Sequence, residues 1–236
     1  VQTFGPVEII RPKLSFKQVL AKYGYPVVSK EQAQYIYEYR HTKSENMRNL
    51  RWYGRPKDGH YKISEKWKYL TEAPFEISKK CCDALKKRPS KAYEKESGRI
   101  RIVGTTAAES SLRLTQYLRY GCNVFDGGKK RSAPMSFWTD QDVLAYIREK
   151  HLPICSVYGD IEKTECGHLT TTGEARTGCM FCAFGAHLEK GENRYQRLKR
   201  THPKLWEVCM DRFGFREVLE YIHVPIEPEY ETTEDQ

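Results

Sequence analysis

The sequence lacks the features that mark membrane and secreted proteins. No apolar run approaches the roughly 20 residues that a helix needs to span a bilayer, and no signal-peptide pattern opens the chain. Internal repeats and low-complexity segments are also missing. With 236 residues, of which 39% are hydrophobic and 30% are charged, the chain is long enough for one substantial core or for a core with a small appendage. We therefore expect a cytoplasmic protein.

Acidic residues are in the minority, since 40 Lys and Arg residues face 31 Asp and Glu residues and the net charge at pH 7 is +9. This excess favours polyanionic partners, which include a phosphorylated or sulfated nucleotide and a nucleic acid. Charge alone does not separate these two. The charge is also uneven, because residues 226–236 are predicted to form a loosely held acidic tail.

Hydrophobic patterning predicts strands that alternate with helices. Residues 7–10 and 100–103 have the pattern of short strands. Thr139 is expected to cap a helix, with Asp142 at the third helical position in a variant of the capping box. This alternation is typical of an α/β fold. Further helices are predicted at about 15–24, 29–37, 74–87 and 107–120, and in two or three later pieces, one ending at Gly214 and the last before Pro225.

Residues 40–70 combine basic and aromatic side chains with glycine and proline. Gly54, Pro56 and Gly59 predict a loop or an irregular insertion here. Cations interleaved with aromatic rings suit a surface that neutralises phosphates and stacks on bases. A solvated loop that docks by its aromatic rings is the alternative, and the sequence leaves both open. The side chains concerned are Arg48, Arg51, Arg55, Lys57, Lys62, Lys66 and Lys68, and Trp52, Tyr53, Tyr61, Trp67 and Tyr69.

The chain has eight cysteines and no secretory signal, which argues against a disulfide framework. Metal ligands, catalytic thiols and plain core residues are the alternatives. Cys209 lies among apolar residues and is predicted to be buried in the core. Cys166, two residues before His168, is a candidate reactive thiol, with a structural or incidental role as the alternative. Neither Cys122 nor Cys155 has a comparable partner.

Two pairs of cysteines stand out. Cys179 and Cys182 form a C-x-x-C, a spacing shared by zinc sites, iron–sulfur clusters and redox pairs. Cys81 and Cys82 are adjacent, and on a helix their side chains diverge by about 100°, so both reach one centre only where the helix bends or ends, or where the centre is large. A cubane cluster is large, and four thiolates complete the ligand set of [4Fe–4S]. Tetrahedral zinc, which typically draws on C-x₂₋₄-C spacings, and two unrelated buried pairs are the alternatives.

Positive charge follows the first cysteine pair. Lys86 comes four residues after Cys82 and is expected on the same helix face, and Lys87 and Arg88 follow it. A [4Fe–4S] centre with four thiolates is a buried anion that needs positive charge nearby. These cations would also attract an anionic substrate. The alternative is a solvated helix end, where the helix dipole favours cations.

Together these residues resemble the family of phosphoadenosine phosphosulfate (PAPS) and adenylyl-sulfate (APS) reductases. The stretch from Cys81 to Pro89 is similar to the family's C-C-x-x-x-K-x-R-P segment, which in the APS branch binds [4Fe–4S] together with a downstream C-x-x-C. The resemblance implies that the cluster ligands are Cys81, Cys82, Cys179 and Cys182. It places Lys86 between cluster and substrate, and it implies that the substrate-binding residues are Lys86, Arg88, Ser110 and Arg113.

Two further blocks are similar to the same family. Residues 102–105, followed by Ser110 and Arg113, resemble its strand-Gly segment and its S-x-x-R. Residues 134–153 resemble its P-[LM]-x-x-W-[ST]-x-x-D-V-x-x-Y-I-x-x-x-x-[LV]-P block. The resemblance runs from about Leu14 to Cys182 and implies a domain at 1–225. The implied fold is a partial Rossmann-like parallel sheet, of the adenine nucleotide alpha-hydrolase-like superfamily, flanked by helices and followed by a helical C-terminal part that carries the cluster.

Two family motifs are missing. The phosphate-binding loop S-G-G-K-D-S is absent, and because it lies upstream of a strand like 7–10 in family members, the chain resembles one that begins partway into the domain. The C-terminal E-C-G-L-H, with its nucleophilic cysteine, is absent too. Glu165-Cys166-Gly167-His168 is superficially similar to it but precedes the C-x-x-C, which leaves Cys166 as the candidate nucleophile. The segment from Gly185 to Arg194 is closer to a diverged bacterial and phage-associated subgroup.

The resemblance implies an oxidoreductase of the PAPS/APS reductase type. In that reaction a thiolate attacks the sulfur of an adenylyl sulfate, the nucleotide leaves, and a thioredoxin-like donor reduces the S-sulfonated cysteine. The alternatives are nucleic-acid sulfur modification or nucleic-acid binding on the same scaffold, which residues 40–70 favour, and a non-catalytic subunit with a structural cluster. The expected partners are an adenine nucleotide, a nucleic acid in the second case, and either a homo-oligomer or another chain that supplies the missing loop.

Overall fold

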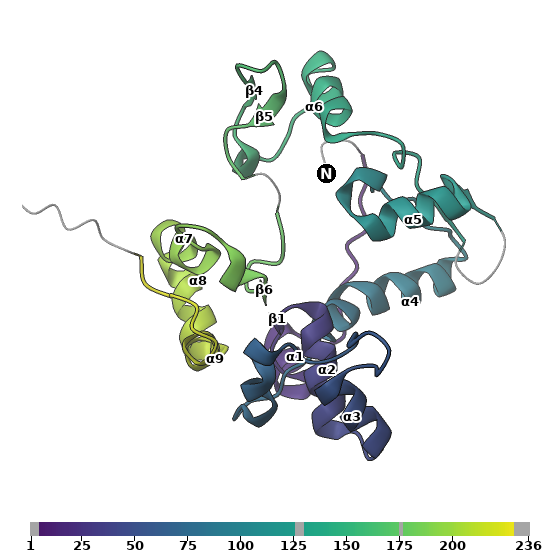
Figure 1. Cartoon of the computed structure of the whole chain (residues 1–236). Helices are drawn as coiled ribbons and strands as arrows, with labels where there is room; N and C mark the ends of the chain where they lie inside the picture. The colour runs from purple at the N-terminus through teal and green to yellow at the C-terminus, as the bar shows by residue number, and fades with distance from the viewer. Residues whose placement is uncertain (1–4, 126–129, 175–176, 229–236) are drawn as a thin grey trace, which may run out of the picture. The chain divides into compact units, whose positions relative to one another are not determined.

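The computed structural model describes residues 5–125, 130–174 and 177–228 (Figure 1). The chain divides into two compact units. Unit 1 consists of residues 1–91 and 179–236, and unit 2 consists of residues 92–178. Along the sequence, unit 2 is therefore an insertion into unit 1. None of the helices in the described part of the chain is both long and apolar enough to cross a membrane.

The first half of unit 1 is built from capped helices around one short strand. Ser15 and Gln18 form a capping box at the start of α1, and the Ser29 side chain accepts a hydrogen bond from the Gln32 amide at the start of α2. Both caps confirm the predicted starts of these helices. The elements are α1 (Phe16–Tyr23), β1 (Val27–Val28), α2 (Lys30–His41), α3 (Glu45–Tyr53) and the 3₁₀ helix η2 (Glu65–Glu72).

Gly24 ends α1 and lets another segment approach closely. Its φ is +87°, and a Cβ at this position would lie 2.2 Å from the Glu76 carbonyl oxygen, so no other residue fits without displacement. The next residue, Tyr25, donates its amide to Glu76 (2.7 Å) and forms a parallel bridge with Ile77. This pairing fixes the stretch that leads into the first cysteine pair.

The helix that carries this pair differs from the prediction at both ends. Residues 74–80 form bends and a bridge rather than a helix, and helical structure begins at Cys81. It continues through the π-helical turn η3 (Asp83–Lys87) into α4 (Arg88–Ser97). Proline normally crowds the carbonyl four residues earlier in an α-helix. Here the preceding turn is wide, with the amide of Arg88 reaching the carbonyl of Asp83 five residues back, and the helix passes through Pro89.

The second half of unit 1 begins with the strand β6 (Ala183–Phe184), which pairs in parallel with β1 through Val27–Ala183 and Val28–Phe184. This small parallel sheet with helices around it confirms the α/β class. The C-terminal part is helical, as predicted, and its helices are the green-to-yellow ribbons of Figure 1. They are η6 (Ala186–Leu188), α7 (Arg194–Thr201), α8 (Pro203–Glu207), the π-helical turn η7 (Val208–Arg212) and α9 (Phe215–Tyr221).

The core of unit 1 is centred on aromatic rings. Phe215 is fully buried, and its ring centroid lies 5.2 Å from that of Tyr25 and 6.3 Å from that of Phe16. Phe181, which lies between the two cysteines of the C-x-x-C, joins the same cluster at 5.6 Å from Phe16. The C-x-x-C turn is therefore anchored by burial of an aromatic side chain, whose packing adds to the area term.

The described residues of unit 2 include the end of α4, the helices α5 and α6, two short antiparallel strand pairs and two 3₁₀ turns. Thr139 and Asp142 form the predicted capping box at the start of α6, and Gly121 ends α5 as expected. The elements are η4 (Ala107–Glu109), α5 (Ser111–Tyr120), β2 (Asn123–Val124) paired with β3 (Arg131–Ser132), α6 (Asp140–Glu149), η5 (Ser156–Tyr158), and β4 (Ile161–Lys163) paired with β5 (Leu169–Thr171).

Two predicted strands are wrong in whole or in part. Residues 7–10 are not assigned to a strand, and Val7, Ile9 and Ile10 expose 43–65% of their surface rather than being buried. Of residues 100–103, only Ile102 forms a bridge, to Ser132. A strand needs a hydrogen-bonding neighbour as well as the right side chains, and the described residues supply none to 7–10.

Residues 40–70 are more regular than the predicted loop. The irregular part covers 54–64, between α3 and η2. Trp67 and Leu70 are buried, and Arg51 is buried against Glu38, with Nε–Oε2 and Nη2–Oε2 distances of 2.7 Å. Of the aromatic residues that suggested a stacking surface, Trp67 therefore belongs to the core, whereas Tyr53, Tyr61 and Tyr69 are exposed.

Candidate functional site

The C-x-x-C forms a turn directly before β6. The amide of Cys182 donates to the carbonyl of Cys179 (3.0 Å), and both thiols are half-buried. Three residues further on, the amide of Gly185 donates to the carbonyl of Val28 (2.8 Å) at the end of β1. The parallel pairing of β6 with β1 thus fixes the position of this cysteine pair in unit 1.

Cys81 and Cys82 lie at the start of their helix, directly before the π turn η3. Cys81 is buried, and it packs with Val19 and Ala84 in a small apolar cluster to which Cys82 and Phe184 of β6 also contribute. Phe184 follows Cys182 by two residues, so the cluster links the two cysteine pairs. All four cysteines belong to unit 1, although almost 100 residues separate the two pairs in sequence.

The thiol of Cys81 donates a hydrogen bond to Cys82, and this bond shifts the pKa values of the two cysteines in opposite directions. It is the main cause that lowers the pKa of Cys82 to about 6, and the charges of Lys30, Lys86 and Lys87 act in the same direction. The same hydrogen bond, followed by burial, raises the pKa of Cys81. These surroundings favour the thiolate of Cys82, the form that binds metals.

The other cysteine pair lies within electrostatic reach of the first. Burial raises the pKa of Cys182, the Phe184 amide and the Arg194 guanidinium lower it, and negative charge on Cys179 and Cys82 raises it. The described residues contain no group of three or more His, Cys, Asp or Glu side chains placed to hold a single metal ion. The fold thus brings the thiols into one neighbourhood without closing them around an ion-sized site.

The two predicted substrate-binding residues of unit 1, Lys86 and Arg88, differ in the groups with which their side chains interact. Lys86 is close enough to Cys82 to lower its pKa, as the spacing of four residues suggested. Arg88 is tied to other groups, because its Nε donates to Asp83 (2.7 Å) and its Nη1 donates to the hydroxyl of Tyr23 (2.9 Å). Of these two residues, Lys86 is therefore the one whose positive charge acts on the Cys82 thiol.

The predicted substrate-binding residues of unit 2 lie at the start of α5. The Ser110 side chain caps the helix by accepting a hydrogen bond from the Arg113 amide (3.3 Å), and the Arg113 side chain forms an ion pair with Glu109. Ser110 also lines a hollow of about 560 Å³, together with Ser111, Tyr117, Trp138 and Thr139. The second and third family-like blocks therefore meet at one concave surface.

A scan against protein-family models matches the phosphoadenosine phosphosulfate reductase domain over residues 22–183, which is more than half of the chain. The chain belongs to the phosphoadenosine phosphosulfate reductase family. The match confirms the family resemblance seen in the cysteine, S-x-x-R and Trp-containing blocks. The proposed subgroup stays a prediction.

No curated protein and no solved structure matches the chain significantly. Membership of the PAPS reductase family implies adenine-nucleotide binding and a role in sulfur metabolism. The matched region includes both cysteine pairs up to Cys182, and it includes Lys86, Ser110 and Arg113.

Relative to the PAPS reductase motifs, Cys166 occupies an unusual place. It lies in the turn of the β4–β5 hairpin, is exposed, and has its pKa lowered by hydrogen bonds from the Thr164 hydroxyl and the His168 amide. The Sγ lies 3.1 Å from the Thr164 oxygen. This environment favours the thiolate, and Cys166 stays a candidate nucleophile.

Sequence reasoning missed three groups near the cysteines. Lys30, at the first turn of α2, is close enough to lower the pKa of Cys82 although 52 residues separate them. Arg194 donates to the carbonyl of Cys182 (2.8 Å). Cys209 was expected in the core and is fully buried, but its pKa is raised to about 12 by burial and by the charge of Cys179, which places it near the C-x-x-C. No local pattern could have revealed these contacts between distant segments.

Proposed function

We propose that this chain is a PAPS reductase-like iron–sulfur protein that acts on an adenylyl sulfate-type nucleotide. A cysteine thiolate attacks the sulfate sulfur, the bond between that sulfur and the phosphate oxygen breaks, and the adenosine nucleotide leaves with the electron pair. A thioredoxin-like dithiol then attacks the S-sulfonated cysteine. Sulfite is released, and the dithiol is oxidised to a disulfide.

The observation that carries this proposal is the convergence of four cysteines within unit 1 in positive surroundings. The Cys81 hydrogen bond and the charges of Lys30, Lys86 and Lys87 lower the pKa of Cys82, and Arg194 donates to the carbonyl of Cys182 in the second pair. A four-thiolate cluster is anionic, and buried anions need such compensation. The same lysines would attract a sulfated and phosphorylated nucleotide.

The donor set fits a [4Fe–4S] cluster better than a zinc ion. Zinc sites typically draw their cysteines from C-x₂₋₄-C spacings, whereas Cys81 and Cys82 are adjacent. A cubane is larger, so its ligands stand further apart. Bound on Cys81, Cys82, Cys179 and Cys182, it would supply a fixed charge distribution and a redox-active centre beside the substrate.

Roles for the other residues are proposed within each unit separately. Lys86 and Lys30 bind and orient the anionic end of the substrate near Cys82. Ser110 and Trp138 line the hollow of unit 2, whose polar and aromatic walls suit a nucleoside. Cys166 is the candidate nucleophile, because its thiol is exposed and its environment favours the thiolate.

A nucleic-acid-binding function is the second candidate, and the exposed rings of Tyr53 and Tyr61, at 69% and 48% exposure, favour it. The Arg55 guanidinium lies 5.1 Å from the Tyr61 ring and is paired with Asp58, which weakens its pull on a phosphate. Binding to single-stranded DNA that weakens steeply with salt would support this candidate.

The test is anaerobic purification followed by assays of iron, acid-labile sulfide and zinc and by visible spectroscopy. About four irons and four sulfides per chain are expected, with loss of both in Cys82→Ser and Cys179→Ser and retention in Cys155→Ser, an exposed control. Zinc without sulfide would rule out the cluster. PAPS and APS turnover is then measured with thioredoxin, and turnover that survives in Lys86→Gln would contradict the substrate role of Lys86.

A further inference from the structure

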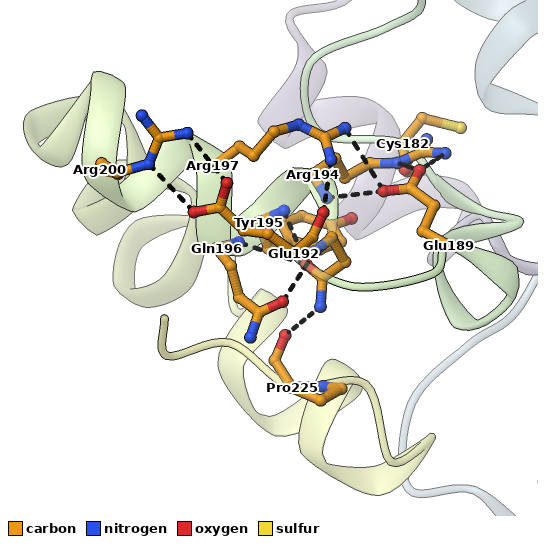
Figure 2. A network of polar contacts seen from close by, with 10 residues as sticks. Cys182, Glu189, Glu192, Arg194, Tyr195, Gln196, Arg197, Arg200 and Pro225 are labelled. Atoms are coloured by element: carbon orange, nitrogen blue, oxygen red, sulfur yellow. Dashed lines mark hydrogen bonds and ion pairs between the residues drawn. The ribbon is translucent and has the colours of Figure 1, made fainter. Parts of the chain in front are cut away.

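One side chain ties the C-x-x-C turn to the helix that follows it (Figure 2). Arg194, the first residue of α7, donates from Nη1 to the carbonyl oxygen of Cys182 at 2.8 Å. Its side chain is only 28% exposed. A hydrogen bond from a charged donor in such a half-buried place is stronger than one between neutral groups.

The next residue of α7 supports the same turn. Tyr195 is fully buried, and its hydroxyl donates to the carbonyl of Phe181 at 3.4 Å. The carbonyl of Cys179 accepts the amide of Cys182. Three carbonyls of the C-x-x-C turn thus have defined donors, two of which come from the first turn of α7.

The Arg194 guanidinium is itself held in place, as Figure 2 shows. Glu189 accepts from the Arg194 Nε at 2.6 Å through one carboxylate oxygen and from the Arg194 amide at 2.7 Å through the other. The Glu189 carboxylate is 22% exposed. A side chain fixed at both its backbone and its head loses little further freedom when it binds the Cys182 carbonyl.

The start of α7 is in turn anchored to the chain beyond α9. Asn193 caps the helix, and its side-chain nitrogen donates to the carbonyl of Pro225 at 2.7 Å. Gln196 completes the capping box and donates to the carbonyl of Glu227 at 2.7 Å. Arg194 therefore projects from a rigid base rather than from a loop.

We propose that Arg194 is a positioning residue for the metal centre, which fixes the backbone at Cys182 and keeps one positive charge beside that ligand. This inference rests on the proposed function, because the charge matters only when the four cysteines hold a metal. It assigns Arg194 no contact with substrate. The effect of Arg194 on the C-x-x-C turn and its effect on the metal centre are measured in separate experiments.

The charge effect has a definite sign. Reduction adds an electron to a centre that already carries excess negative charge, so a nearby cation stabilises the reduced form. Arg194→Gln removes that cation and should lower the equilibrium constant for reduction about tenfold, which corresponds to ~59 mV for a one-electron couple. Arg194→Lys keeps the charge and should lie much closer to the wild type.

The test compares Arg194→Gln and Arg194→Lys with Arg200→Gln in the full chain. Arg200 is on the same helix, but its side chain is 61% exposed and pairs with Glu192, so it serves as the matched control. Hydrogen–deuterium exchange of the peptide that covers residues 178–185 reports on the turn in metal-free protein. Midpoint potentials from anaerobic titration report on the centre in loaded protein.

In Arg194→Gln we expect the amides of Cys182 and Gly185 to exchange about tenfold faster, because a charge-assisted hydrogen bond is lost, and we expect the lower potential. Unchanged exchange together with an unchanged potential would overturn the inference. If Arg194→Gln does not fold, Glu189→Gln tests the same clamp, since it frees the guanidinium while keeping its charge. Wild-type protein without metal would refute the proposed cluster, while the exchange measurement would still decide the clamp.

Discussion

The two units of this protein are stabilised in different ways. Among the described residues, the buried apolar side chains belong to unit 1 except for Ala133 and Leu169, and the polar Thr106 and Ser136 are also buried in unit 2. Helices of both units carry side-chain caps, as at Ser29 in unit 1 and at Thr139 in unit 2, but α5 and α6 of unit 2 contain no buried residue. Unit 1 is thus specified by long-range packing, and unit 2 largely by short-range signals.

This difference explains where the candidate chemistry lies. A metal centre needs ligands that are held in fixed positions, and the four cysteines are attached to the well-packed unit 1. The exposed thiol of Cys166 and the Ser110 hollow lie in unit 2. The mutations below contrast the two units.

The largest effect is expected from truncation in the aromatic core of unit 1. Phe215→Ala should lower the free energy of unfolding by about 3–5 kcal/mol, because the buried ring leaves a cavity next to Tyr25 and Phe16. Leu118→Ala in unit 2, at 75% exposure, should change it by less than about 0.5 kcal/mol. Urea denaturation followed by tryptophan fluorescence and circular dichroism measures both. Equal losses would show that unit 1 has no dominant core.

The second largest effect is expected in the pH dependence of Cys82 alkylation. In metal-free protein, alkylation of Cys82 should rise through a midpoint near pH 6, because its pKa is lowered to about 6 from the ordinary value of 9.0. The lowered pKa also means that the thiolate stabilises the fold above the ordinary value, and that this contribution is lost as the pH falls through about 6. Iodoacetamide labelling with peptide mass spectrometry gives the profile.

Lys30→Gln should move the Cys82 profile to higher pH and leave that of Cys166 unchanged, since the Cys166 thiol is acidified by Thr164 and His168 instead. A Cys82 profile that does not respond to Lys30→Gln would show that α2 contributes nothing to the site.

A moderate loss of stability is expected when the buried Arg51–Glu38 ion pair of unit 1 is broken. Glu38→Gln leaves the Arg51 guanidinium buried with a neutral partner, and it should cost about 2 kcal/mol because the pair is only partly accessible to water. Glu94→Gln removes the partner of Arg101 in unit 2, and it should cost less than about 1 kcal/mol because the Arg101 side chain is 42% exposed, against 9% for Arg51. Thermal denaturation of both variants decides the comparison, and the reverse ranking would contradict it.

The smallest loss of stability is expected from removal of a helix cap. Removing a cap should open the helix locally in unit 2 but not in unit 1. Thr139→Ala removes a cap worth about 1 kcal/mol from a helix with no fully buried residue, so α6 should open locally. Ser29→Ala should cost a similar amount without opening α2, because Ala33 and Ile36 hold that helix in the core. Amide exchange resolved by peptide distinguishes local opening from global loss.

The sequence predicted what local rules control. The caps at Ser15, Ser29 and Thr139 were found, because a polar side chain at a helix start needs only its nearest neighbours. The strands at 7–10 and 100–103 were mostly wrong, since a strand depends on a partner that local patterning does not identify. The first cysteine helix was placed too early because the wide turn of η3 has no sequence signal.

The candidate site was predicted in part for the same reason. The four cysteines and Lys86 came from spacing and from the family resemblance, and the fold brings them into one unit. Lys30 and Arg194 were missed, because their roles arise only when α2 and α7 are placed against the cysteines. Residues 40–70 were expected as a loop, but hydrophobic burial of Trp67 and Leu70 holds part of them in the core.

The insertion of unit 2 into unit 1 has a consequence for how the chain is held together. Unit 2 begins ten residues after Cys82 and ends directly before Cys179. A metal bound to both cysteine pairs would cross-link the chain and close a loop of roughly 100 residues. A cross-link of that span can stabilise the folded protein by ~4–5 kcal/mol, because it lowers the conformational entropy of the unfolded chain. Oxidative loss of the metal would remove this constraint, so damage to the centre would lower the stability of the whole polypeptide.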